Sequence, residues 1–139
     1  MLTDLPWIPI EDDGFIGLIG PVLYKPFVDG VGRFRFTAEE KHRNRAGFVQ
    51  GGMLMSFADR ALGNTARERH PERAQTTVQF DIHFIRAARL GEVVEMECHI
   101  LKETRSLVFM EGRITTEDEL VATVKGIWKI IERRDPPGN

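Results

Sequence analysis

Two features near the middle of the chain have the residue types and spacing to do chemistry. The first is Gly51-Gly52, where the absence of a Cβ lets another molecule approach the backbone closely. If a helix begins there, its first N–H groups are unpaired and carry the positive end of its dipole. The second is Asp59, eight residues beyond Gly51. On a helical wheel Asp59 lies beside Ser56 and Gly63, so its carboxylate has room for another molecule or chain.

One helix is expected to carry both features. From Gly51 onward, apolar side chains recur at the three- and four-residue spacing of a buried helix face. They are Met53, Leu54, Phe57, Ala58, Ala61, Leu62 and Thr65. Because Pro71 disfavours helical geometry at the residue before it, we expect the helix to end near His70. At about 1.5 Å per residue its length would be roughly 30 Å, enough for the spine of one small domain.

Composition bounds the class of protein. The 139 residues are 42% hydrophobic, which predicts a single domain over 1–139 with its own core. The net charge of −2, spread along the chain, argues against a nucleic-acid-binding tail or a polybasic membrane patch. Cys98 stands alone, which fits a reducing compartment. No apolar run approaches the roughly 20 residues of a membrane span, and no signal-type segment opens the chain. We expect a cytoplasmic protein with no nucleic-acid or membrane partner.

The first fifty residues predict an irregular arm, a short helix and a hairpin. In chain order we expect an arm over 1–13, a helix capped by Asp12 or Asp13 and ending at Leu18, strands over 22–28 and 31–37 joined at Asp29-Gly30, and a polar loop over 38–50. Residues 1–19 thus form an N-terminal arm with a short helix.

After Pro71 the hydrophobic pattern has a period of two, typical of long antiparallel strands with one buried face. The expected strands cover 76–84, 94–100, 108–114 and 120–130, with turns at 89–92, 104–106 and 117–119. In the first strand, one face should carry Val78, Phe80, Ile82 and Phe84, and the other Thr77, Gln79, Asp81 and His83. The simplest packing lays the helix across the concave face of a curled antiparallel sheet, an α+β fold. Residues 132–139 are expected to form a frayed tail.

The motif H-x-N-x-x-G-x-x-Q-G-G at 42–52, followed by D-x-A-L-G at 59–63, resembles the signature of the hotdog-fold acyl-CoA thioesterases of the phenylacetate-pathway type. The segments GPVLYKPFVDG and FIRAARLGE are also similar to that family. The resemblance covers about residues 14–131. The chain departs from the family's pattern at Gln50, where the family usually has a histidine before the two glycines.

The resemblance implies a hotdog fold that pairs edge to edge into a homodimer, often stacked into a homotetramer. The acyl-CoA thioester would lie at the dimer interface and be hydrolysed without a cofactor, coenzyme A being part of the substrate. By position, Asp59 matches the catalytic carboxylate and Gly51 the backbone donor to the thioester carbonyl. Asn44 matches a polar residue near the carboxylate, and Thr77 a hydroxyl residue that orients water in some members. The expected catalytic residues are Asp59, Gly51, Asn44, Gln50 and Thr77, and the expected substrate-binding residues are Gly52, His42 and Ser56.

Distance along the helix gives a separate reason to expect a dimer. Thioester hydrolysis needs a donor for the developing oxyanion and a group that activates water or attacks directly. Gly51 and Asp59 suit these roles, but eight residues of helix separate them by about 12 Å. A two-fold axis that sets two helices antiparallel would bring each Asp59 near the partner's Gly51.

Plainer interpretations stay open for several residues. Asn44 could cap a loop turn, and Thr77 could be an ordinary strand residue. Gln50 could shape the pocket or hydrogen-bond the thioester oxygen. An apolar acyl pocket is suggested by Phe48, Met53, Met55 and Phe57, although position on the helix does not separate pocket wall from core.

The sequence is less consistent with other functions and sites. A hotdog hydratase would need a different motif, with Asp and His close together, which the chain lacks. A non-catalytic acyl-CoA-binding module would keep the glycines and would not need Asp59. The four histidines lack metal-ligand spacing, so no metal is expected. Basic residues near strand ends that could meet the phosphates of coenzyme A are Arg86, Arg89 and Arg105.

Overall fold

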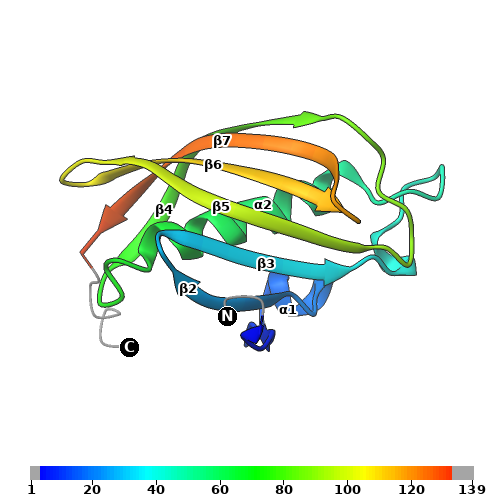
Figure 1. The fold of residues 1–139 in the computed structure, drawn as a ribbon, viewed down its shortest axis with the longest axis horizontal. Helices are drawn as coiled ribbons and strands as arrows, with labels where there is room; N and C mark the ends of the chain where they lie inside the picture. Colours follow the sequence, from blue (N-terminus) through cyan, green and yellow to red (C-terminus); the bar gives the residue numbers. More distant parts are fainter. Residues whose placement is uncertain (1–3, 133–139) are drawn as a thin grey trace.

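The structure is a computed structural model that describes residues 4–132. One long helix lies against a curled antiparallel sheet of seven strands in the order β1-β2-β3-β5-β6-β7-β4 (Figure 1). The elements are β1 (Ile8–Pro9), α1 (Phe15–Ile19), β2 (Leu23–Val28), β3 (Val31–Thr37), the 3₁₀ helix η2 (Glu40–His42), α2 (Gly51–Arg67), β4 (Ala74–Phe84), β5 (Val93–Glu103), β6 (Leu107–Thr116) and β7 (Glu119–Ile131). The predicted α+β hotdog arrangement is confirmed, with an open sheet whose edges are β1 and β4.

The apolar stripe of α2 forms the centre of the core, as the sequence predicts. All seven side chains of the stripe are buried, and Phe57 packs edge-on against Phe36 of β3 with ring centroids 4.8 Å apart. The helix begins at Gly51 as predicted and ends at Arg67, before His70. Beyond Ala66 the side chains from Arg67 to Arg69 are exposed, so further helical turns would bury no apolar surface. The helix is therefore about 25 Å long, shorter than expected.

Strand β4 departs from the predicted alternation at one point. Thr77 pairs with Trp128 of β7, whereas Gln79 pairs with Ile127, so Val78 is an extra residue. Such a bulge shifts the face on which the following side chains lie. Thr77 consequently shares the helix-facing side with Phe80, which pairs with Gly126. The prediction that Thr77 and Phe80 lie on opposite faces is wrong, because it assumed unbroken pairing along the strand.

The other predicted elements match the structure within a few residues. The β2–β3 hairpin turns at Asp29 and Gly30 with φ of 53° and 75°, the geometry of a tight two-residue hairpin loop. The short helix begins at Phe15, and Asp12 accepts hydrogen bonds from the N–H groups of Gly14 and Gly17. Apart from Glu132, the predicted tail lies outside the described residues. No helix within 4–132 is long and apolar enough to cross a membrane.

Candidate active site

The first turn of α2 presents unpaired backbone donors. Within residues 4–132 the N–H groups of Gly51 and Gly52 meet no protein acceptor, as expected at a helix start. The two glycines have different surroundings. A Cβ on Gly51 would lie 3.2 Å from Cζ of Phe84, whereas one on Gly52 would meet only Cγ of Gln50, at 3.8 Å. Phe84 therefore covers Gly51, and open space lies beside Gly52.

Asp59 and Thr77, two of the expected catalytic residues, are in direct contact. Thr77 Oγ1 donates a hydrogen bond of 2.5 Å to Asp59 Oδ1. The carboxylate is half-buried, and its Oδ2 has no donor within the described part of the chain. This contact depends on the bulge at Val78, which turns Thr77 toward the helix. One carboxylate oxygen is thus oriented by the protein, and the other is available to a water molecule or a substrate.

One turn beyond Asp59, a second β4 side chain packs on the helix. The amide of Gln75 lies against Gly63, where a Cβ would stand 2.6 Å from Gln75 Nε2. Gly63 therefore leaves room for the Gln75 amide against the helix, one turn beyond Asp59. The sequence motif contained Gly63, but the sequence did not indicate which strand it meets.

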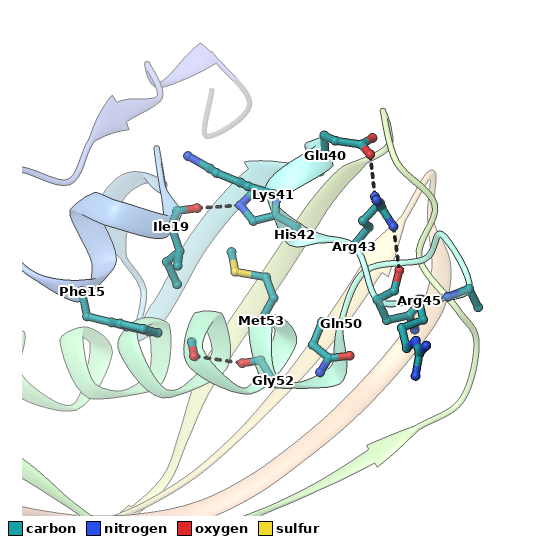
Figure 2. A pocket seen from close by; sticks show the side chains of 13 residues that line it. Phe15, Ile19, Glu40, Lys41, His42, Arg43, Arg45, Gln50, Gly52 and Met53 are labelled. Atoms are coloured by element: carbon teal, nitrogen blue, oxygen red, sulfur yellow. Dashed lines mark hydrogen bonds and ion pairs between the residues drawn. The ribbon is translucent and has the colours of Figure 1, made fainter.

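Five of the expected site residues line an open cleft of about 1240 Å³ between α1, η2 and the start of α2 (Figure 2). They are His42, Asn44, Gln50, Gly52 and Ser56. Asp59, Thr77 and Gly51 do not line it, so within one chain the expected residues form two groups. Gly51 and the five cleft residues lie around the start of α2. Asp59 and Thr77 lie about two helical turns further along.

Several side chains of the cleft are already bonded to the protein. Asn44 Oδ1 accepts hydrogen bonds from the N–H groups of Ala46, at 2.9 Å, and Phe48, at 3.1 Å. Asn44 therefore does cap its loop, and its NH₂ group has no acceptor among the described residues. Ser56 Oγ donates to the carbonyl of Gly52 at 2.9 Å.

His42 is buried, and both of its ring nitrogens bond the backbone. Nδ1 accepts from the N–H of Glu39 at 2.9 Å, and Nε2 lies 2.6 Å from the carbonyl oxygen of Ile19, to which it donates. This tautomer leaves no ring nitrogen for a ligand. The expected contact of His42 with substrate stays a prediction, which the ring can meet only through its carbon atoms.

Of the four side chains expected to form an acyl pocket, one lines this cleft. Met53 lines the cleft, whereas Phe57 is fully buried in the core. Phe48 and Met55 are 36% and 41% exposed and do not line the cleft. The apolar wall contains instead two residues that sequence patterns missed, Phe15 and Ile19 of α1. No local signal indicates where so short a helix packs.

The described residues give little support for a reactive thiol, a metal site or a role of Arg86 in binding phosphate. Cys98 is buried, and burial raises the pKa of its thiol far above the usual range, so it remains a protonated thiol. Residues 4–132 contain no group of three or more His, Cys, Asp or Glu side chains placed to hold a metal ion. Arg86 forms ion pairs with Glu92, at 3.4 Å, and Glu119, at 2.9 Å, so it is occupied within its own chain.

Comparisons with known proteins agree on one family. The sequence pattern of the Thioesterase superfamily matches residues 46–123, more than half of the chain. The chain is 31% identical over 93 residues to PA0474 of Pseudomonas aeruginosa, a candidate esterase, across 66% of this chain and 69% of that protein.

Solved structures of low sequence identity share the fold. The Escherichia coli PaaI protein, from the phenylacetic acid degradation operon, superposes with a TM-score of 0.74 and 18% identity, covering 79% of each chain. The protein smu.793 of Streptococcus mutans, solved bound to acetyl CoA, superposes with a TM-score of 0.72 and 18% identity, covering 81% of this chain and 90% of the other. The resemblance stated from the motifs is confirmed.

Proposed function

The chain belongs to the Thioesterase superfamily and is a hydrolase, and from this premise we propose that it hydrolyses the thioester of an acyl- or aryl-CoA to the free acid and coenzyme A. The observation that carries the proposal is the hydrogen bond from Thr77 to Asp59 on the helix whose first N–H groups are unpaired. The acetyl-CoA-bound relative of the same fold supports a CoA thioester as the substrate.

In the proposed reaction, the N–H of Gly51 stabilises the oxyanion that forms when the thioester carbonyl is attacked. Asp59 either takes a proton from the attacking water or attacks the carbonyl itself, and Thr77 holds its Oδ1 in place. The C–S bond then breaks, and the thiolate of coenzyme A leaves and is protonated. If Asp59 itself attacks, water then hydrolyses the acyl–Asp59 anhydride, which releases the acid and restores the carboxylate. Asp59 supplies or activates the nucleophile and the backbone N–H stabilises the oxyanion, so the proposed reaction needs no metal or cofactor. We place it in the cytoplasm.

The proposed active site lies between two copies of the chain. Gly51 and Asp59 are about 12 Å apart along α2, so a single chain cannot bring both to one carbonyl. Strand β4 offers a surface for a second copy, because it is a sheet edge of 11 residues with exposed apolar side chains. Val78 is 54% exposed and Ile85, just after the strand, 55%. An unpaired edge of this kind favours association by strand pairing. We propose a homodimer formed along β4, and a homotetramer of two dimers.

Release of free thiol from a panel of acyl-CoAs tests the proposal. Asp59→Asn keeps the side chain's size and removes its charge. Loss of a general base costs about 10²–10⁴-fold in rate, so we expect kcat to fall at least about a hundredfold while acyl-CoA still binds. Normal turnover by Asp59→Asn would refute the catalytic assignment. Binding without hydrolysis by the unaltered protein would indicate a non-catalytic acyl-CoA-binding module instead.

Oxygen isotopes separate the two possible roles of Asp59. In a single turnover in H₂¹⁸O, direct attack by water places ¹⁸O in the acid product. Attack by Asp59 instead forms a mixed anhydride, and when water opens it at the carboxyl carbon of Asp59, the acid leaves unlabelled and ¹⁸O enters the Asp59 side chain, which mass spectrometry of the protein detects.

A further inference from the structure

The cleft at the start of α2 has one apolar end and one basic end. In Figure 2, Phe15 and Ile19 of α1 lie at one end with Met53 of α2 beside them, and Arg43 and Arg45 lie at the other. Phe15 is 62% exposed and lines the cleft. Gly52 and Gln50 lie between the two ends.

Helix α1 is held firmly against the rest of the protein although it has only five residues. His42 Nε2 donates to the carbonyl of Ile19, and Lys41 Nζ donates to the carbonyl of Gly20 at 2.5 Å. At its other end, the Asp12 carboxylate that binds the start of α1 also accepts from Arg60 of α2 at 2.6 Å. The N–H groups of Gly14 and Gly17, together with Arg60, hold the pKa of Asp12 below its ordinary value, so this clamp stays charged at neutral pH. Phe15 is therefore part of a helix that is hydrogen-bonded to the rest of the protein at both ends.

The basic end suits an anionic part of the same ligand. Arg43, Arg45 and Glu40 line this end, whereas Lys41, the third cation of the cleft, extends toward Ile19 and bonds the Gly20 carbonyl (Figure 2). Arg43 pairs with Glu40, with Nε and Oε1 2.5 Å apart, whereas Arg45 has no partner among the described residues. A ligand with an apolar group at one end and negative charge at the other matches this arrangement, and an acyl-CoA has that form.

We propose, on the basis of the function above, that Phe15 determines which acyl groups the enzyme accepts. The substrate class is an apolar alkyl or aryl acyl group of coenzyme A, which packs against Phe15, Ile19 and Met53. The phosphates of coenzyme A lie toward Arg43 and Arg45. Because α1 is clamped, the size of residue 15 sets the space available to the acyl group.

Two substitutions on α1 provide a matched test. Phe15→Ala removes the ring from the cleft, and Leu18→Ala removes an apolar side chain that is 73% exposed on the same helix and does not line the cleft. The measurement is kcat/KM for straight-chain acyl-CoAs from two to sixteen carbons and for phenylacetyl-CoA. A methylene gained or lost in an apolar pocket changes kcat/KM by about tenfold or more. We expect Phe15→Ala to move the preferred chain length upward by at least about two carbons, with a change of about tenfold in relative kcat/KM. Leu18→Ala should keep the original preference.

Several results would overturn the proposal. These are an unchanged preference in Phe15→Ala, an equal shift in Leu18→Ala, or a uniform loss for all acyl groups with dissociation of the oligomer, which would make Phe15 a subunit contact. Binding of thioether analogues, in which a CH₂ replaces the carbonyl, is measured in parallel by calorimetry. If the unaltered protein binds these with a chain-length preference that Phe15→Ala shifts, but hydrolyses no thioester, the proposed function fails and the role of Phe15 stands.

Discussion

Thr77→Val isolates the hydrogen bond on which the catalytic assignment rests. Valine keeps the shape of threonine and removes the hydroxyl that donates to Asp59 Oδ1 over 2.5 Å. Thr77 is exposed and its backbone pairing in β4 does not depend on the hydroxyl, so the fold should be unaffected. A hydrogen bond to a charged group contributes about 1.5–3 kcal/mol. If the bond orients Asp59 in the transition state, its loss lowers kcat by roughly 10–150-fold.

Thr77→Ser is the matched control, because it keeps the hydroxyl and removes only the methyl group. We expect Thr77→Ser to retain kcat within a few-fold, and both variants to keep KM close to the original value. Steady-state thiol release with saturating acyl-CoA measures both constants, and a thermal melt checks the fold. If Thr77→Val turns over as fast as Thr77→Ser, the hydroxyl does not act through Asp59 and Thr77 is an ordinary strand residue.

Three further predictions concern the loop, the motif departure and the half-buried Arg86–Glu92 ion pair. Asn44→Asp keeps the oxygen that caps the loop and removes the NH₂ donor. If the amide binds substrate, kcat falls while the melting temperature stays unchanged. Full activity would show that Asn44 only caps the loop. Gln50→His should retain activity with a new pH-dependent limb near pH 6–7, whereas complete loss would indicate a role in shape. Burial acts to raise the pKa of Glu92, but the N–H of Arg89 and the Arg86 guanidinium outweigh it and hold this pKa below the ordinary 4.5. A carboxylate with a lowered pKa stabilises the fold above its unfolded pKa, so Glu92→Gln should cost about 1–3 kcal/mol in the free energy of unfolding at pH 7. That difference should close as the pH falls below about 4.5 toward the lower folded value, and a gap independent of pH in urea melts would exclude the charge as its source.

Local sequence rules predicted the elements of the fold well. The stripe on α2 and the turn at Asp29-Gly30 follow from side-chain periodicity and from the positive φ that such a turn requires. The bulge at Val78 did not follow, because it depends on how β4 pairs with β7 rather than on β4 alone. That missed bulge reversed the predicted face of Thr77, the residue that contacts Asp59.

The resemblance named the candidate site residues, and the structure adds how they are arranged. The motif supplied Gly51 and Asp59, and the wider resemblance supplied Thr77 by position. It did not indicate that both nitrogens of His42 are committed to Glu39 and Ile19. The bond to Ile19 joins residues 23 apart in the sequence, and it depends on a short helix whose packing no periodicity encodes.

The central claim, an active site shared between two chains, is tested most directly by a mixed dimer. Gly51→Pro removes the N–H donor at the first helical position, where proline is favoured, and Gln50, with φ of −61° and ψ of 136°, already has the geometry that precedes a proline. Gly51→Ala adds a Cβ against Phe84 and keeps the N–H, so it controls for crowding.

Asp59→Asn and Gly51→Pro chains carrying different tags are co-expressed, and the dimers that hold both tags are purified and assayed for thiol release. Each parent dimer should be nearly inactive. In the mixed dimer one site combines the intact Asp59 of one chain with the intact Gly51 of the other, so we predict about half of the unaltered activity per dimer. Activity no higher than that of the two parents would contradict a shared site and place both residues' functions within a single chain.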